Sequence, residues 1–443
     1  MPVSKSDPIV IIGAGVFGLS TALQLATEGY TDISVFERDD QVPGRFSAGY
    51  DLNKIVRAEY EDPWYTELTL KAIAGWKTPL YAPHYHQTGF LHCVSGRGPE
   101  QATQTLERFH ATIKNHPVFA HKLVPITTAT QIPQDVAWQL NGPLPGWKGY
   151  FNPLAGYAHA ANALRAVYSA AAAVGVKFFL GPERGTITTL LRGGVATAPG
   201  QVTGVRTQSG QVHSCRLVIV AVGAAAGTLL PELGAQVVAK SWAIGHVRLT
   251  DAETSALRGL PVTYARDLGF LFEPDPATNL LKICPMGGGY INTDPATGVS
   301  LPPPTRRESD NVLPPEDERR MRTLLQHALP ALADRPFVRK KLCWFADTAD
   351  SEFIVDFVPG SAGSVALCSG DSGHLFKMLP IVGEWVARLV SEGQQAETRW
   401  RWKGAVGEEE KETGKKWAGG DVSWRLGATR EFAEIKPVPG ARL

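Results

Sequence analysis

The feature that most constrains the fold is a glycine-rich turn close to the N-terminus. Residues 13–18 read Gly-Ala-Gly-Val-Phe-Gly and directly follow a β-branched run at residues 9–12. Such a run is typical of a strand buried on both faces of a sheet. Helical spacing of apolar residues over 16–27 and a second buried strand over 33–36 follow. The sequence therefore predicts a strand–helix–strand unit whose two strands are parallel.

Each glycine of this turn is expected to have a structural role. Gly13 permits the tight turn, Gly15 lets the backbone approach a pyrophosphate, and Gly18 allows the helix to pack closely on the sheet. Glu37 ends the second strand, 19 residues after Gly18, where its carboxylate can accept hydrogen bonds from ribose hydroxyls. The pattern predicts a bound FAD or NAD rather than NADP. Its N-terminal position, with a second glycine-rich turn near residue 370, favours FAD.

Bulk composition narrows the class of protein. The 443 residues are 44% apolar and 20% charged, with a net charge of +1, so the length predicts two connected domains. The near-zero net charge argues against nucleic acid or a membrane surface as a partner. No continuous segment approaches the roughly 20 apolar residues of a membrane span. Five scattered cysteines without a CxxC pair argue against disulfides and a metal site. The C-terminal Ala441-Arg442-Leu443 is similar to a peroxisomal signal, so we expect a peroxisomal or cytoplasmic protein.

The remaining pattern predicts the domain organisation. Strands over 216–222 and 365–369 end in glycine-rich turns, the second before a helix over 379–389, and an alanine-rich helix covers 157–173. In the segments between them, apolar and polar residues alternate and turn residues are frequent. Both features are typical of antiparallel strands. We expect an α/β fold (α+β overall), with a Rossmann-like FAD-binding domain and an inserted, mostly antiparallel substrate domain. The expected limits are 1–80, 150–235 and 340–395 for the FAD-binding domain, 81–149 and 236–339 for the substrate domain, and 396–443 for a C-terminal tail or lid.

Several segments carry a resemblance to a known family. Residues 47–57 read SAGYDLNKIVR, residues 342–350 read LCWFADTAD, and residues 369–377 read SGDSGHLFK. Further matches lie at 245–249, 269–274 and 281–284. Over nearly its full length the chain resembles the FAD-dependent amine oxidases that include monomeric sarcosine oxidase, the fructosyl amino acid oxidases (amadoriases), and the fungal pipecolate and saccharopine oxidases. The resemblance implies a glutathione-reductase-type, DAO-like fold.

The resemblance also implies how the cofactor is held. The cysteine matching Cys343 is bonded through sulfur to the 8α position of FAD in this family, and a thioether needs only one nucleophilic thiol beside the ring. Without the resemblance, Cys343 beside Trp344 is equally well explained as a buried core thiol. Backbone amides of the turn at 370–374 suit the electron-rich edge of a reduced flavin. The other residues expected to contact FAD are Val16, Phe17, Arg38, Ser47, Asn53, Lys54, Gly223, Asp371, Ser372, Gly373, His374 and Lys377.

Three basic residues are expected at the reacting end of the flavin. The resemblance makes Lys282 the catalytic lysine near flavin N5, where a fixed cation promotes the reaction with oxygen. Taken alone, it is a strand lysine between apolar neighbours, and an exposed position is the simpler interpretation. Arg57 and Lys377 match residues that hold the substrate carboxylate, and a guanidinium does so with two parallel hydrogen bonds.

Departures from the family pattern bear on the substrate. Amadoriases generally carry a small residue where this chain has Arg57. They also carry an acidic pair where it reads Cys284-Pro285-Met286-Gly287. Their C-terminal arginine pair has only Lys415-Lys416 as a counterpart. We therefore expect a monomeric oxidase that converts an amino acid with a secondary amine (sarcosine, pipecolate, saccharopine or another N-substituted amino acid) to an imine and reduces O2 to H2O2. The alternatives are a fructosyl amino acid oxidase, an FAD dehydrogenase and a flavin-binding protein without enzymatic activity.

Overall fold

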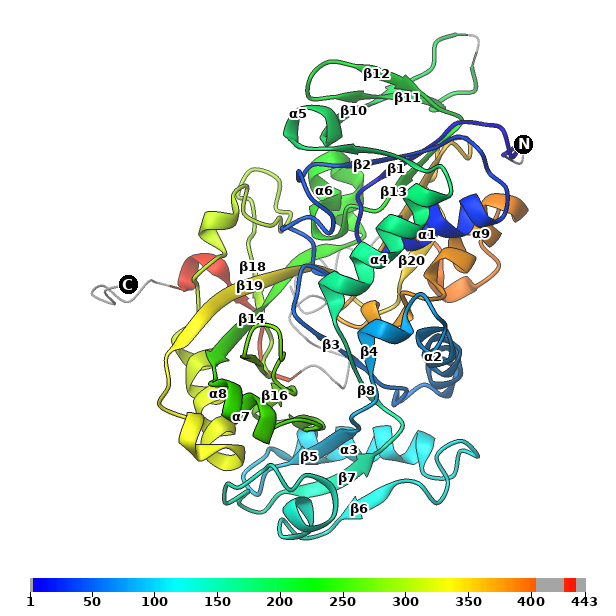
Figure 1. The fold of residues 1–443 in the computed structure, drawn as a ribbon. Coiled ribbons are helices and arrows are strands. Elements are labelled where there is room, and N and C mark those ends of the chain that lie inside the picture. Colours follow the sequence, from blue (N-terminus) through cyan, green and yellow to red (C-terminus); the bar gives the residue numbers. More distant parts are fainter. Residues whose placement is uncertain (1–2, 196, 404–425, 436–443) are drawn as a thin grey trace.

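A six-stranded, mostly parallel sheet forms one half of the molecule (Figure 1). The computed structural model describes residues 3–195, 197–403 and 426–435. The strand order is β20-β21-β13-β1-β2-β9, and only the β20–β21 pair is antiparallel. The strands are β1 (Ile9–Ile12), β2 (Ile33–Glu37), β9 (Lys177–Leu180), β13 (Leu217–Val220), β20 (Ile354–Phe357) and β21 (Val365–Ser369). The predicted parallel strand–helix–strand unit is confirmed by β1, α1 (Val16–Thr27) and β2.

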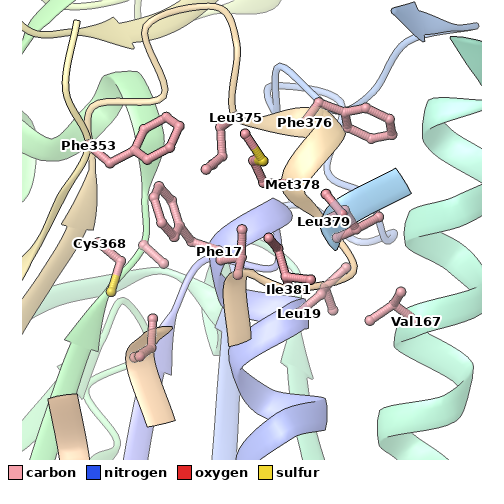
Figure 2. Packing of buried hydrophobic residues seen from close by; sticks show 14 of the residues in the cluster. Phe17, Leu19, Val167, Phe353, Cys368, Leu375, Phe376, Met378, Leu379 and Ile381 are labelled. Atoms are coloured by element: carbon pink, nitrogen blue, oxygen red, sulfur yellow. The ribbon is translucent and has the colours of Figure 1, made fainter. Parts of the chain in front are cut away.

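Helices cover one face of this sheet and a small sheet covers the other. Helix α1 packs between α4 (Ala160–Ala173) and α9 (Val382–Glu392). Figure 2 shows the apolar contacts there, with Phe17 and Leu19 of α1 near Leu379, Ile381 and Val167. On the opposite face lie the three antiparallel strands β10 (Ile187–Arg192), β11 (Val202–Thr207) and β12 (Val212–Ser214). Two buried faces explain why the parallel strands read as continuous apolar runs.

A second, ten-stranded sheet forms the other half. Most of its pairs are antiparallel, as predicted, and β15–β5 and β18–β22 are parallel. Its strands are β5 (Phe90–Val94), β6 (Val124–Ile126), β7 (Lys148–Asn152), β14 (Val238–Arg248), β15 (Val262–Ala265), β16 (Gly269–Leu271), β17 (Leu280–Pro285), β18 (Tyr290–Ile291), β19 (Phe337–Asp347) and β22 (Arg430–Glu431). Helices α3 (Glu100–Ile113), α7 (Asp251–Ala256) and α8 (Pro315–Ala328) accompany it.

A three-stranded sheet of β3 (Lys54–Val56), β8 (Gly156–Ala158) and β4 (Tyr85–His86) lies beside α2 (Pro63–Trp76). Because residues 156–158 pair with both β3 and β4, the alanine-rich helix begins at Ala160 and not at 157. Helix α9 begins at Val382 and not at 379, since a separate 3₁₀ turn precedes it. The short helices α5 (Pro182–Gly185) and α6 (Ala226–Leu229) complete the fold.

Two observations concern the expected domain limits. Strand β19 belongs to the ten-stranded sheet and crosses the predicted boundary at residue 340. Most of the predicted tail or lid lies outside the described residues, and residues 430–431 of it add β22 to the edge of that sheet. The limits themselves stay a prediction. In the part of the chain that the structure describes, none of the helices has the length and apolarity to cross a bilayer.

Candidate active site

A cavity of about 590 Å³ opens where the carboxyl ends of β1, β2, β13 and β21 face strands β14, β17 and β19 of the second sheet. This is the usual ligand position in open parallel sheets, and the volume is typical of a ligand site. Most residues predicted to contact FAD line it: Gly13, Gly15, Val16, Phe17, Glu37, Arg38, Ser47, Lys54, Gly223, Cys343, Asp371, Gly373, His374 and Lys377. Lys282 and Arg57 line it too, whereas Gly18, Asn53 and Ser372 do not.

The glycine-rich turn forms a cradle free of side chains. Gly13 has φ +103°, and a Cβ there would lie 2.4 Å from the Ala221 carbonyl oxygen. A Cβ on Gly18 would lie 1.9 Å from the Gly13 carbonyl oxygen, so Gly18 acts by packing and not by contact with a ligand. At Gly15 the nearest atom to a Cβ is Ser47 Oγ at 3.5 Å, which leaves open space on the cavity side. These residues fit the pyrophosphate of FAD.

Two alanine substitutions separate packing from ligand contact in this turn. We expect Gly18→Ala to lower the stability by about 3 kcal/mol or more, because its methyl group collides with backbone. Gly15→Ala should fold with a near wild-type melting temperature but bind less flavin, since its methyl group fills the cradle. Circular dichroism melting and flavin absorbance per chain measure the two effects. Equal losses of melting temperature in both variants would contradict this assignment.

Glu37 is held at the end of β2 by backbone amides. Its two carboxylate oxygens accept from the N–H groups of Ala14 and Asp39, each at 3.0 Å. Burial raises the pKa of Glu37, and these two hydrogen bonds and the charge of Arg38 oppose that rise. The carboxylate therefore lies beside the cradle in a fixed orientation, where the ribose hydroxyls were predicted.

Cys343 faces the cavity from β19, opposite Trp242 of β14. Its sulfur is partly exposed and lies 4.0 Å from Lys54 Nζ and 3.9 Å from the Ala48 carbonyl oxygen. The interpretation as a buried core thiol is wrong. Burial lowers the pKa of Lys54, but the Cys343 sulfur and the Asp51 carboxylate outweigh it and raise that pKa above its ordinary value. Lys54 lies on strand β3, and Arg57 directly follows that strand.

Lys282 is buried on β17, with a side chain only 2% exposed. The ammonium donates to Asp51 Oδ2 at 2.6 Å and to the Asn53 carbonyl oxygen at 2.7 Å, and it lies 5.1 Å from the centre of the Phe272 ring. An exposed strand lysine is therefore excluded. The predicted contact of Asn53 with FAD is not seen in the cavity lining, and this residue contributes through its backbone carbonyl.

Arg57 and Lys377 lie at the aromatic end of the cavity. The Arg57 guanidinium is 4.9 Å from the centre of the Phe109 ring and donates to the Glu59 carbonyl oxygen. Lys377 Nζ donates to the Tyr60 hydroxyl at 2.9 Å and to the His374 carbonyl oxygen at 3.0 Å. Burial, with the charge of Arg57, holds the pKa of Lys377 well below its ordinary value. This end of the cavity offers the Arg57 guanidinium and the Lys377 amino group to an anionic ligand group.

Tyr60 is a site residue that sequence reasoning missed. Its hydroxyl also lies 2.9 Å from His374 Nδ1, and His374 Nε2 lies 2.8 Å from the Ser351 carbonyl oxygen. Since that carbonyl can only accept, Nε2 carries the proton and Nδ1 accepts from the tyrosine. Its position three residues after Arg57 was the only available signal. Asp51, described below, was also missed, although it stands three residues before Lys54.

The turn after β21 connects the two sheets. Asp371 accepts hydrogen bonds from the N–H groups of Ala346 (3.0 Å) and Gly373 (3.1 Å), and burial raises the pKa of Asp371 to about 6. Ser372, with φ +44°, donates its N–H to the Ala346 carbonyl oxygen and points its hydroxyl toward Thr348. Ser372 therefore holds the turn to β19, and its predicted role in contacting FAD has no counterpart in the cavity lining.

A dinucleotide cradle that opens into a cavity ending in aromatic and cationic side chains defines a flavin-dependent oxidoreductase. The chain belongs to the DAO family of FAD-dependent oxidoreductases, whose family model matches residues 8–389. It is an FAD-dependent oxidase, and the predicted family, fold class and enzyme class are confirmed.

The relatives cover almost the whole chain. L-saccharopine oxidase of Schizosaccharomyces pombe is 31% identical over 431 residues, covering 93% of this chain and 96% of that protein. Monomeric sarcosine oxidase of a Bacillus species is 23% identical, covering 87% and 93%. The crystal structure of the fructosamine oxidase Amadoriase II from Aspergillus fumigatus superposes with a TM-score of 0.84 at 32% identity, covering 98% and 97%.

Proposed function

We propose that this oxidase acts on the C–N bond of an amino acid carrying a secondary amine. The observation that carries the proposal is the pairing of Arg57 and Lys377 at one end of the cavity, beside the aromatic residues Tyr60 and Phe109. A guanidinium and an amino group that can both donate hydrogen bonds suit a carboxylate, and the aromatic walls exclude water from the amine and the carbon next to it. The relatives named for saccharopine and sarcosine support the same class of substrate.

In the proposed reaction FAD supplies the site that accepts two electrons and passes them to oxygen. Arg57 and Lys377 bind the substrate carboxylate and so orient the C–N bond of the amine for the transfer of two electrons to FAD. The substrate loses two electrons and two protons to become an imine, and O2 gains them to become H2O2. The buried Lys282 ammonium places a fixed positive charge where oxygen is reduced, which stabilises the negative charge that develops there.

We further propose that FAD is attached covalently through Cys343. The bond joins Sγ to the 8α carbon, and one hydrogen is lost from the thiol and one from the 8α methyl group. O2 would take up the two electrons and the two protons released and become H2O2. The position of Cys343 on the cavity wall, with Lys54 Nζ 4.0 Å from its sulfur, supports this step because the thiol can contact a flavin bound in the cavity.

A fructosyl amino acid oxidase is the second candidate, favoured by the likeness to Amadoriase II. Two features of the cavity argue against it. Met286 and Gly287 line the cavity in the segment where amadoriases carry acidic residues. Arg57 occupies the position where they generally carry a small residue.

The monomeric state and the peroxisomal location also remain proposals, and Ala441–Leu443 lie outside the described residues.

Anaerobic titration with two sets of amines tests the proposed function. Sarcosine, L-pipecolate and saccharopine form the first set, and fructosyl-glycine and fructosyl-valine form the second. We expect at least one member of the first set to bleach the flavin and, in air, to release one H2O2 per imine formed. The amide of the best substrate, which lacks the carboxylate charge, is the matched control and should react poorly. Turnover of the fructosyl compounds alone would replace this function with the second candidate.

Arg57→Lys tests how the carboxylate is bound. The variant keeps a positive charge but loses the two parallel hydrogen bonds of a guanidinium, so KM should rise about 10-fold to 100-fold. The rate of anaerobic flavin reduction at saturating substrate should change far less. Arg165→Lys, at an exposed position on α4, serves as the control. An unchanged KM in Arg57→Lys would show that Arg57 does not bind the carboxylate.

A further inference from the structure

Asp51 lies between the two lysines that the proposed function uses. Its side chain is only 1% exposed, and Oδ2 accepts from Lys282 Nζ at 2.6 Å and from Lys54 Nζ at 2.9 Å. Lys54 Nζ in turn lies 4.0 Å from Cys343 Sγ. One carboxylate oxygen therefore connects the predicted oxygen site to the predicted site of flavin attachment, although Asp51 comes from a different segment than either Lys282 or Cys343.

We propose that Asp51 is a positioning residue that holds the Lys282 ammonium at the oxygen site and the Lys54 ammonium beside the Cys343 sulfur. The proposal rests on the proposed function, because it assigns no new reaction. It explains how a lysine that is only 2% exposed is accommodated in this cavity. A buried ammonium without an anionic partner is costly, and the other acceptor of Lys282 is a neutral carbonyl.

The charges around Asp51 leave the cluster positive. Lys282, Lys54 and Lys341 face it from β17, β3 and β19, and together they outweigh burial and hold the pKa of Asp51 far below its ordinary value. His246, which pairs with Lys282 across β14 and β17, is neutral at physiological pH because burial lowers its pKa to about 4.

The two cysteines near the cluster are Cys284 and Cys343. Burial raises the pKa of Cys284 to about 12, so it adds no charge. Three ammonium groups around one carboxylate give an excess of positive charge beside the cavity while Asp51 orders two of them. The Asp51 carboxylate thus holds the Lys282 and Lys54 side chains in place without cancelling the positive charge of the cluster.

Removing the carboxylate should disturb both sites together. In Asp51→Asn the buried Lys282 side chain loses its anionic partner, and its burial then opposes a positive charge without compensation. The positive charge should therefore be lost as the pH rises, and the reaction of reduced flavin with oxygen should slow at least tenfold between about pH 6 and pH 9. The wild-type rate should stay flat over the same range. Lys54 also loses its anchor, and the fraction of covalently bound flavin should fall.

The experiment compares purified wild-type, Asp51→Asn, Asp51→Glu and Asp317→Asn holoenzymes. Asp317 is a buried carboxyl that accepts from Tyr290 at 3.0 Å and does not line the cavity, so its asparagine variant controls for the loss of a buried carboxylate. The measurements are the fraction of flavin that stays with acid-precipitated protein and the pH profile of reoxidation. Asp51→Glu keeps the charge but moves it by one carbon, about 1.5 Å. It should retain a flat pH profile with lower covalent yield and slower reoxidation.

The outcomes separate this inference from the proposed function. Wild-type flavin that no amine reduces would end the proposed function, and wild-type flavin that leaves with the acid supernatant would end the proposed covalent attachment, whatever the variants do. A normal wild type with an Asp51→Asn variant of equal covalent yield and the same flat profile would overturn the role of Asp51 alone. If Asp51→Asn yields no folded protein, Asp51→Glu carries the test, and wild-type values of both covalent yield and rate would overturn the inference.

Discussion

Cys343→Ser is expected to release all of its flavin when the protein is precipitated with acid, whereas wild-type protein should keep the yellow colour in the pellet. Serine preserves the shape of the cavity wall on β19 but provides no sulfur to bond to the 8α carbon. Intact mass spectrometry gives a second measurement. The wild-type chain should exceed the polypeptide mass by one FAD less two hydrogen atoms, and the variant should show the polypeptide mass.

Cys284→Ser is the matched control, because Cys284 lines the same cavity from β17. Burial raises the pKa of Cys284 to about 12, which makes its thiol a poor nucleophile. This variant should therefore keep its flavin covalently bound. Flavin that remains bound in acid in the Cys343 variant, or that leaves in the Cys284 variant, would move the attachment site away from Cys343.

Lys282→Met should slow the reaction of reduced flavin with oxygen by about 100-fold to 1,000-fold, which is typical when one preorganised electrostatic group is removed. Methionine fills a similar volume without charge, so the rate of anaerobic reduction by substrate should stay within about threefold. Stopped-flow mixing of the pre-reduced protein with aerated buffer measures the first rate, and anaerobic mixing with substrate measures the second.

The control for Lys282 is Lys340→Met, which removes a lysine on β19 that does not line the cavity. Its reoxidation rate should match that of the wild type. If Lys282→Met instead slowed anaerobic reduction as much as reoxidation, the lysine would act in substrate oxidation or in holding the cavity together. A role at the oxygen site would then be wrong.

Local sequence patterns were sufficient to predict the strand–helix–strand unit. The helix predicted over 16–27 matches α1 residue for residue. The helical spacing of its apolar residues is a property of this short segment alone. The helices predicted to start at 157 and 379 begin three residues later in each case. Pairing with distant strands decided the first boundary, and the 3₁₀ turn that precedes α9 decided the second.

The sequence by itself determined the cradle and the class of cofactor, since the glycines, the helix and Glu37 lie within one continuous unit and act through backbone geometry. Only the tertiary structure decided what surrounds Lys282. An alternating strand shows that this side chain points away from Leu281 and Ile283, but not whether another segment covers that face. The fold brings Asp51 there, 231 residues earlier in the chain, and a buried ion pair replaces the exposed lysine that the strand pattern alone suggests.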